Sequence, residues 1–174
     1  MEKDFKYKRI IILGGSGSGK STLANRISLF TRYPAYHLDN LFLNSKWEIV
    51  DKSKWDDVSK IFLSKDIGVV DGNYNSAIPN RVKWADLVVY IDISTWLRLR
   101  RLFVRSIRIR LGLDKRYGVP DGSKEKLSIK FLLWAYRWNK NKRDKMFEML
   151  ESIQDKKVLI IKEPKKLDLK ELFK

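Results

Sequence analysis

Short hydrophobic runs alternate along the chain with segments whose apolar residues recur at helical spacing. Five of these runs are rich in β-branched or aromatic residues, which is typical of strands. Strands that alternate with helices favour a parallel sheet covered by helices on both faces. The pattern therefore predicts a three-layer α/β fold with a five-stranded parallel sheet. The predicted strands are Ile10 to Leu13, Pro34 to Leu38, Ile67 to Val70, Leu87 to Ile91 and Val158 to Ile161.

No linker, internal repeat or low-complexity tract interrupts this alternation, so we expect a single domain over residues 1–174. Ser94 is a typical helix cap and Gly112 a typical helix stop, which predicts a long helix between them. The segment Leu113 to Gly122 contains two glycines and a proline and therefore predicts a loop.

The composition is that of a basic chain without cysteine. Of the 174 residues 44% are hydrophobic and 33% are charged, and the formal net charge is +16. The lack of cysteine excludes a disulfide scaffold and a zinc site built from thiolates. A strongly basic balance predicts attraction to polyanions, but nucleotides, nucleic acid and anionic lipid all meet that description.

The apolar stretches are too short for a membrane segment. The longest, Ile10 to Leu13 and Phe131 to Ala135, fall far below the roughly 18 residues that a membrane span requires. The segment Met1 to Arg9 carries both acidic and basic residues and leads into only four apolar ones, which is too few for a signal-peptide core. We therefore expect a cytoplasmic protein with no membrane partner.

A glycine-rich loop follows the first predicted strand and opens the next helix. Its sequence, GGSGSGKS from Gly14 to Ser21, matches the phosphate-binding pattern G-x-x-x-x-G-K-[ST] in the strand-to-helix context that the pattern requires. Glycines let successive backbone N–H groups point at a phosphate, and the helix N-terminus adds to the attraction. We expect Lys20 to reach the β- and γ-phosphates of ATP and Ser21 to hold magnesium. The predicted nucleotide-binding residues are Gly14, Gly15, Ser16, Gly17, Ser18, Gly19, Lys20, Ser21 and Thr22.

Two carboxylates stand directly after predicted strands. In an open parallel sheet the carboxyl ends of the strands line the ligand crevice. Asp71 follows the strand that ends at Val70, where a carboxylate can hold magnesium; an Asp-Gly turn is the simpler alternative. Asp39 is placed to meet an acceptor, whose hydroxyl it would orient or deprotonate, or to help hold magnesium. A turn or a helix cap is its alternative role.

Basic residues are concentrated between Arg98 and Arg143. This segment contains 15 basic and 3 acidic residues, so it carries +12 of the net charge of +16. Arginines at positions 98, 101, 105 and 108 recur at helical spacing, which predicts four guanidinium groups along one face. In a phosphoryl transferase that face, with a lid segment at about 106–126, would close over the donor and neutralise its charge. A solvated basic face is the alternative.

Other patterns favour structural roles. Asn141-Lys142-Arg143-Asp144 spells the guanine-binding N-K-x-D of GTPases, but no strand precedes it, so we interpret it as a coincidence. His37 is predicted to be a hydrogen-bonded structural residue. Trp134 and Trp138 form a stripe at helical spacing, which favours core packing. With their basic neighbours they could instead bind single-stranded nucleic acid.

Several spaced motifs together resemble one family. These are GGSGSGKSTLANRI, HLDNLF, VVDGNY, Arg81, ADLVVYID and the arginine-rich helix. The set is similar to the DNA topology modulation protein family, a group of small adenylate-kinase-like P-loop proteins, and the match runs from about Arg9 to Tyr136. One difference from adenylate kinases is that Asn73-Tyr74 replaces the Phe-Pro-Arg that often follows the Asp-Gly pair.

The resemblance implies a P-loop NTPase fold of the nucleoside-monophosphate-kinase type, with ATP as donor and a lid after Arg105. By similarity to nucleotide kinases, Arg101 and Arg105 fall where arginines at the base of the lid contact phosphates. Many P-loop kinases contact adenine just after the last strand, where this chain has Lys162-Glu163-Pro164-Lys165.

The residues and the resemblance together predict a kinase that uses ATP and Mg²⁺. Lys20, Arg101 and Arg105 would stabilise the transferred charge, and Asp39 would complete the catalytic set. Ser21 and Asp71 would hold the metal. Two alternatives remain open, namely an ATPase that binds nucleic acid through the segment 98–143, and a regulator switched by ATP. For the acceptor site the predicted residues are Asp39, Asp71 and Arg81, the last binding an anionic group.

Overall fold

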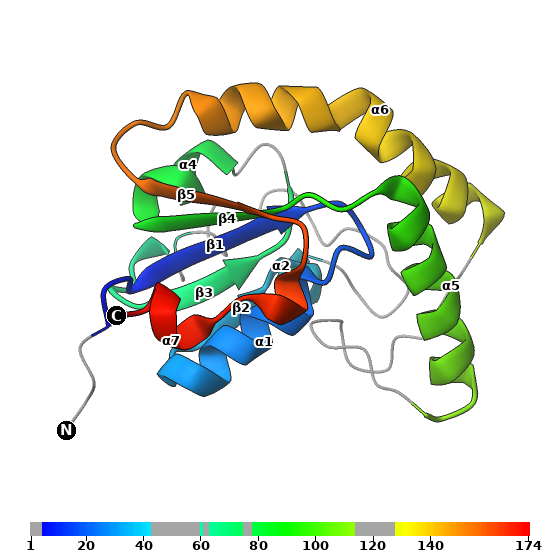
Figure 1. The fold of residues 1–174 in the computed structure, drawn as a ribbon, viewed down its shortest axis with the longest axis horizontal. Coiled ribbons are helices and arrows are strands. Elements are labelled where there is room, and N and C mark those ends of the chain that lie inside the picture. The colour runs from blue at the N-terminus through cyan, green and yellow to red at the C-terminus, as the bar shows by residue number, and fades with distance from the viewer. Residues whose placement is uncertain (1–4, 43–59, 61–62, 75–77, 114–127) are drawn as a thin grey trace.

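A computed structural model gives the fold and describes residues 5–42, 60, 63–74, 78–113 and 128–174 (Figure 1). The predicted strands and the long arginine-rich helix are all present. In chain order the elements are β1 (Arg9–Gly14), α1 (Lys20–Thr31), β2 (Ala35–His37), α2 (Leu38–Phe42), β3 (Gly68–Asp71), α4 (Ile78–Trp84), β4 (Leu87–Ile91), α5 (Thr95–Arg110), α6 (Ile129–Glu151), β5 (Lys157–Ile161), the 3₁₀ turn η3 (Pro164–Lys166) and α7 (Leu169–Leu172).

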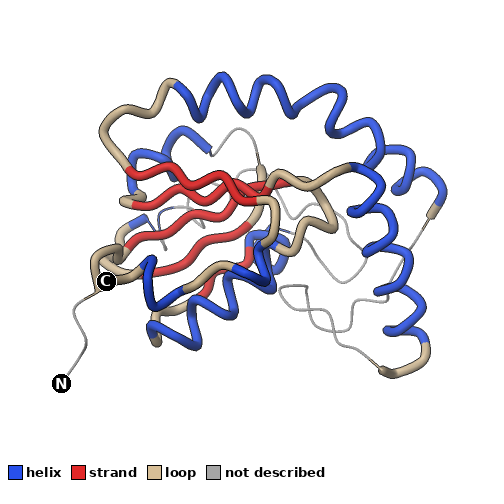
Figure 2. The backbone as a smooth tube through the Cα atoms, viewed as in Figure 1, coloured by secondary structure: helices blue, strands red, loops and turns tan. Residues whose placement is uncertain are grey.

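The five strands form one sheet in the order β2-β3-β1-β4-β5, and every neighbouring pair is parallel (Figure 2). This confirms the predicted sheet. Because β1 lies in the middle, the order of strands reverses on either side of it, and parallel sheets bind ligands at the carboxyl edge beside such a point. The glycine-rich loop leaves β1 at that edge.

Strand residues alternate between two hydrophobic cores. Ile11 and Leu13 of β1 pack with α2, α4 and α6, whereas Ile10 and Ile12 pack with α1 and α7. All four side chains are fully buried. Helices therefore cover both faces of the sheet, and Figure 1 shows α4 and α6 on one side with α1 and α7 on the other. The buried central strands explain the continuous apolar runs from which the sheet was predicted.

The long arginine-rich helix has the predicted ends. Ser94 Oγ accepts a hydrogen bond from the backbone N–H of Leu97 at 3.3 Å, and Gly112 adopts a positive φ of 70° after the last turn. Of the expected lid, residues 106–110 belong to α5 itself, and residues 114–126 lie outside the described part of the chain. Within the described ranges no helix has the length and apolarity needed to cross a membrane.

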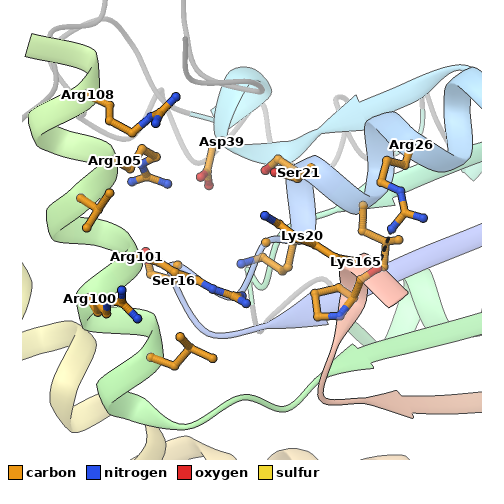
Figure 3. A pocket seen from close by; sticks show the side chains of 17 residues that line it. Ser16, Lys20, Ser21, Arg26, Asp39, Arg100, Arg101, Arg105, Arg108 and Lys165 are labelled. Carbon is orange, nitrogen blue, oxygen red and sulfur yellow. Dashed lines mark hydrogen bonds between the residues drawn. The ribbon is translucent and has the colours of Figure 1, made fainter. Parts of the chain in front are cut away.

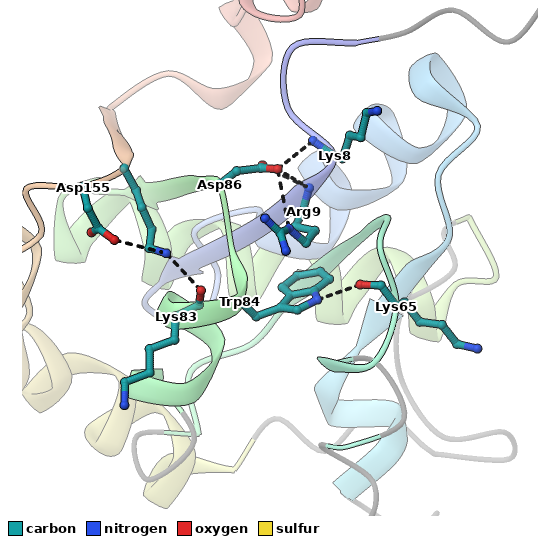
Figure 4. A network of polar contacts seen from close by, with 8 residues as sticks. Lys8, Arg9, Lys65, Lys83, Trp84, Asp86 and Asp155 are labelled. Atoms are coloured by element: carbon teal, nitrogen blue, oxygen red, sulfur yellow. Dashed lines mark hydrogen bonds and ion pairs between the residues drawn. The ribbon is translucent and has the colours of Figure 1, made fainter.

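At the opposite, amino-terminal edge of the sheet, polar contacts tie the starts of the strands together (Figure 4). The Asp86 carboxylate accepts hydrogen bonds from the backbone N–H groups of Lys8 at 3.1 Å and Arg9 at 3.0 Å. Trp84 Nε1 donates to the Lys65 carbonyl at 2.8 Å. These contacts fix the starts of β1 and β4, which lie at the edge of the sheet opposite the glycine-rich loop. We therefore assign this edge a role in stabilising the fold.

Candidate active site

The glycine-rich loop has the backbone conformation of a phosphate cradle. Gly17 and Gly19 adopt positive φ angles of 80° and 99°, in the left-handed region that side-chain-bearing residues rarely occupy. Gly19 precedes the first turn of α1 without a side-chain cap, so an anion can take the place of one there. Lys20 Nζ donates to the Gly15 carbonyl at 3.3 Å, which keeps the ammonium against the loop.

Two side chains, those of Asn73 and Arg98, support the loop from beneath. Asn73 pairs with both backbone groups of Gly14, accepting from its N–H at 3.1 Å and donating to its carbonyl at 2.9 Å. Arg98 donates to the carbonyls of Ser16 at 3.2 Å and Ala135 at 3.1 Å. A Cβ atom on Gly15 would lie 2.3 Å from Arg98 Nη1, so glycine is required there.

Arg98 therefore differs from the other arginines of α5. It is 1% exposed and packs 5.5 Å from the ring centre of Trp138. Burial lowers its pKa, while the nearby Tyr90 and Asp92 oppose this shift. Arg98 therefore does not line the pocket with Arg101, Arg105 and Arg108, and instead joins the loop to α6.

Ser21 and Asp71 lie together behind the loop, as the sequence predicts. The Ser21 hydroxyl donates to Asp71 Oδ2 at 2.6 Å, and Asp71 is only 3% exposed. A hydroxyl and a carboxylate are oxygen donors of the kind that Mg²⁺ prefers. No group of three acidic, histidine or cysteine side chains gathers among the described residues. The donor set thus fits a magnesium ion that takes its other ligands from phosphates and water.

His37 lies next to this pair. Its Nδ1 is hydrogen-bonded to Asp71 Oδ1, and its Nε2 lies 3.1 Å from Asn25 Oδ1. Burial alone would lower the pKa of His37, but the hydrogen bond to Asp71 and the charges of Asp71 and Asp39 outweigh it and raise the pKa above its ordinary value of 6.5. The predicted hydrogen-bonded histidine is confirmed, although its partner is the proposed metal ligand.

The Arg81 prediction requires a correction. Its side chain is fully buried, so it has no surface with which to contact an acceptor. The guanidinium donates to the carbonyls of Gly72 at 2.7 Å and Asn73 at 2.6 Å. Burial lowers the pKa of Arg81 to about 10, against the opposing charge of Asp71, which leaves it protonated at neutral pH. Arg81 fixes the segment that carries Asn73 and thereby supports the loop indirectly.

A pocket of about 710 Å³ opens between the loop, α1 and α5 (Figure 3). Figure 3 shows Asp39 across the pocket from the arginines that project from α5. Arg101 Nη1 also donates to the Ser18 carbonyl at 3.1 Å, so α5 is tied to the loop. Among the described residues the lining contains seven basic side chains and one carboxylate, that of Asp39, which suits a polyanionic ligand. The basic residues are Lys20, Arg26, Arg100, Arg101, Arg105, Arg108 and Lys165.

Most of the predicted site residues share this pocket. Its lining includes Ser16, Gly17, Gly19, Lys20, Ser21, Thr22, Asp39, Arg101 and Arg105. Others lie just behind it. Ser18 and Asp71 are buried next to the lining residues, and Gly14 and Gly15 form the base of the loop.

Comparison with known proteins supports the architecture. No protein-family model matches the chain, and no curated protein matches it. Shikimate kinase from Acinetobacter baumannii in complex with shikimate superposes with a TM-score of 0.56 at 16% identity, over 90% of this chain and 84% of that one. Shikimate kinase from Aquifex aeolicus superposes with a TM-score of 0.53 at 17% identity, over 94% of this chain and 93% of that one. The chain has the three-layer α/β P-loop NTPase fold.

At these identities the likeness shows the fold alone. Shikimate kinase from Bacteroides thetaiotaomicron agrees, with a TM-score of 0.56 at 12% identity over 94% of this chain and 90% of that one. The narrower resemblance to the DNA topology modulation family stays a prediction. In this P-loop fold the pocket lies at the carboxyl edge of the sheet, where the topology places ligands.

One wall of the P-loop pocket is held in place by a contact that was not predicted. Arg26 donates to the carbonyls of Pro164 at 2.6 Å and Leu167 at 3.2 Å. This holds the segment after β5 against α1, so that Pro164 and Lys165 reach the pocket. The sequence predicts that this segment follows the last strand. It does not predict the contact with Arg26, because the two partners are 138 residues apart and no local pattern connects them.

Helix α6 divides its aromatic residues between core and surface. Trp138 is 4% exposed, which confirms core packing, whereas Trp134 is 51% exposed, so the core prediction is wrong for it. Trp134 instead stacks on Phe131 with ring centres 5.7 Å apart. A second, smaller hollow of about 350 Å³ lies here, lined by Lys130, Leu133, Trp134, Arg137, Trp138 and Lys142.

The GTPase-like tetrapeptide Asn141-Lys142-Arg143-Asp144 lies inside α6, so helix and not strand directly precedes it. Arg143 makes two hydrogen bonds to the Asp92 carboxylate, at 2.9 and 2.8 Å. The hydrogen bond to Asp92 raises the pKa of Arg143, against the opposing effect of burial. The interpretation of the tetrapeptide as a coincidence is confirmed.

Proposed function

We propose that the protein is a Mg²⁺- and ATP-dependent phosphotransferase that acts on a hydroxyl group of a small molecule. The observation that carries this proposal is the convergence of Lys20, the Ser21–Asp71 pair, Asp39 and the α5 arginines on one pocket of about 710 Å³. A site of this kind works by positioning and by neutralising charge, with no covalent chemistry from the protein.

The donor half of the site consists of the loop and the first turn of α1. Backbone N–H groups from Gly15 to Lys20 would hold the β-phosphate of ATP, and Lys20 with Arg101 would balance the charge that develops on the transferred group. Ser21 and Asp71 would hold the metal. When bound, Mg²⁺ neutralises charge on the phosphate oxygens.

The acceptor half consists of Asp39 and the outer turns of α5. Tyr74 donates to Asp39 Oδ1 at 3.2 Å, which orients the carboxylate. Burial, followed by the charge and hydrogen bond of Asp39, raises the pKa of Tyr74, so it remains a donor. A carboxylate attracts a hydroxyl and repels a phosphate, whereas Arg105 and Arg108 attract an anion. We therefore favour a small hydroxylated anion over a nucleoside monophosphate as acceptor.

The test is ADP formation from Mg-ATP against a panel of acceptors. The panel contains shikimate, sugar acids and polyols, each nucleoside monophosphate and, separately, single- and double-stranded DNA. Stimulation by one hydroxylated anion, with its phosphorylated product identified by mass, is the expected result. Stimulation by DNA alone, with phosphate released to water, would contradict a small-molecule kinase.

Asp39→Asn should lower kcat by about 10²-fold, because the amide still accepts a hydrogen bond but cannot take the hydroxyl proton. Nucleotide affinity should stay within about twofold, since Asp39 lies at the acceptor end. Asp66→Asn makes the same change at an exposed position before β3 and should leave kcat unaltered. An Asp39→Asn enzyme with the wild-type kcat would remove Asp39 from the catalytic set.

A second candidate function rests on the hollow along α6. Exposed Trp134 lies there beside Lys130, Arg137 and Lys142, an arrangement that suits stacking and phosphate contacts with single-stranded nucleic acid. Oligonucleotide affinity should then fall at least tenfold between about 50 and 200 mM salt. Trp134→Ala should weaken it by about a further tenfold.

Trp96→Ala is the matched control, because Trp96 is 76% exposed on α5 and outside the hollow. Equal losses in the two variants would contradict a specific α6 surface. Binding of DNA that is unaffected by salt would contradict a phosphate-contacting site altogether.

A further inference from the structure

A continuous chain of hydrogen bonds runs from α1 through β2 and β3 back to α1. Asn25 Oδ1 lies 3.1 Å from His37 Nε2, and His37 Nδ1 is bonded to Asp71 Oδ1. Asp71 Oδ2 accepts from the Ser21 hydroxyl at 2.6 Å. The His37 and Asp71 side chains are 13% and 4% exposed, so water cannot readily replace these partners.

The sheet itself enforces the central contact. β2 and β3 are parallel neighbours, and their register places His37 directly beside Asp71. Side chains at paired positions of adjacent strands lie on the same face of a sheet, so the imidazole and the carboxylate meet through the backbone arrangement alone. Asn25 then fixes the ring from the far side, because it lies one turn beyond Ser21 on α1.

This arrangement divides the two oxygens of Asp71 between separate tasks. Oδ1 is occupied by the His37 ring, whereas Oδ2 is directed toward Ser21, which lines the pocket. A carboxylate held at one oxygen cannot rotate to present the other, or both, to a cation. The amide of Asn25 removes the remaining freedom, since it prevents the imidazole from turning.

We propose that His37, supported by Asn25, is a positioning residue that holds Asp71 Oδ2 in place for the metal beside Ser21. This inference rests on the proposed function, because it concerns the magnesium ion that the phosphotransferase would use. His37 does not touch substrate or metal. Partners of this kind behind a metal ligand commonly contribute tenfold to a hundredfold in metal affinity.

The experiment measures how strongly Mg²⁺ enhances the binding of a fluorescent ADP analogue, with EDTA as the metal-free reference. Wild-type protein should bind the analogue more tightly with magnesium. His37→Leu should need at least about tenfold more Mg²⁺ for the same enhancement, while its affinity in EDTA stays near the wild-type value. His37→Gln, whose amide can still donate to Asp71, should restore part of the lost metal affinity.

Asn25→Ala provides a second reading if His37→Leu does not fold. It should weaken the magnesium effect less than the loss of His37, and it should add nothing to His37→Leu where that variant is folded, because Asn25 acts through the ring. Ser28→Ala is the matched control. It removes a hydrogen bond to the Tyr33 carbonyl of 2.6 Å from the same helix and should leave the magnesium effect unchanged.

The outcomes separate the two proposals. Unaltered magnesium enhancement in both His37→Leu and Asn25→Ala would overturn the positioning role and leave the phosphotransferase intact. Equal losses with magnesium and with EDTA would also overturn it, because they would indicate general damage to the loop. Wild-type protein that binds no nucleotide, or binds it without regard to Mg²⁺, would overturn the proposed function and the positioning role with it.

Discussion

Lys20→Ala is expected to lower the rate of phosphoryl transfer by at least about 10³-fold. The ammonium stands at the first residue of α1 and is held against the loop by the Gly15 carbonyl at 3.3 Å. Removal of a single group that stabilises transition-state charge costs about 10²–10³ in rate, and here the group also balances charge on the bound donor. The measurement is the rate of ADP formation at saturating acceptor, determined over a range of ATP concentrations.

The structure indicates that this variant should still fold. The loop is supported by Asn73 and Arg98, whose hydrogen bonds to Gly14 and Ser16 do not involve Lys20. The thermal midpoint should therefore stay within a few degrees of the wild-type value. Lys170→Ala removes the same charge from an exposed position on α7 and should leave the rate unchanged. Unchanged ATP consumption in a folded Lys20→Ala protein would end the P-loop hypothesis.

The parts of the site that follow from local patterns could be predicted from the sequence. The loop from Gly14 to Ser21 is a contiguous motif, and Asp71 and Asp39 each stand directly after an apolar run. Parallel strands bring such positions to one edge by topology alone. The fold was predictable for the same reason, because strands buried on both faces leave continuous apolar runs.

The parts that depend on long-range burial could not be predicted. Arginine is ordinarily a surface residue. Nothing in the sequence adjacent to Arg81 or Arg98 indicates that their guanidinium groups are hydrogen-bonded to backbone carbonyls in the core. Arg98 reaches Ser16 across 82 residues and Ala135 across 37. Trp134 shows the opposite error. Helical spacing correctly placed Trp138 in the core, but it cannot tell which part of a long helix extends past the sheet.

These buried arginines connect the core to the glycine-rich loop. Arg81 holds the backbone of Gly72 and Asn73, Asn73 holds Gly14, and Arg98 holds Ser16. The first part of the loop is thus anchored at Gly14 and Ser16 by Asn73 and Arg98, which do not line the pocket. The conformation of the cradle depends on the packing of the sheet and α6 as well as on its own glycines.

Arg81→Leu is accordingly expected to be the most destabilising single substitution at the site, with a loss of about 3–5 kcal/mol in the free energy of unfolding. The variant leaves the carbonyls of Gly72 and Asn73 without their donors, and it removes the positive charge that lies near the buried Asp71 carboxylate. Urea unfolding, followed by circular dichroism, measures the effect.

Arg26→Leu provides the matched comparison. Arg26 also donates to two backbone carbonyls, those of Pro164 at 2.6 Å and Leu167 at 3.2 Å, but it is only partly buried, so water can replace the lost donors. Arg26→Leu should therefore lower the free energy of unfolding by about 1 kcal/mol. Equal losses in the free energy of unfolding for the two variants would contradict the conclusion that burial of the Arg81 charge makes its removal more costly. If Arg81→Leu kept its stability and lost only acceptor binding, Arg81 would belong to the acceptor site. That result would contradict its complete burial in the structure.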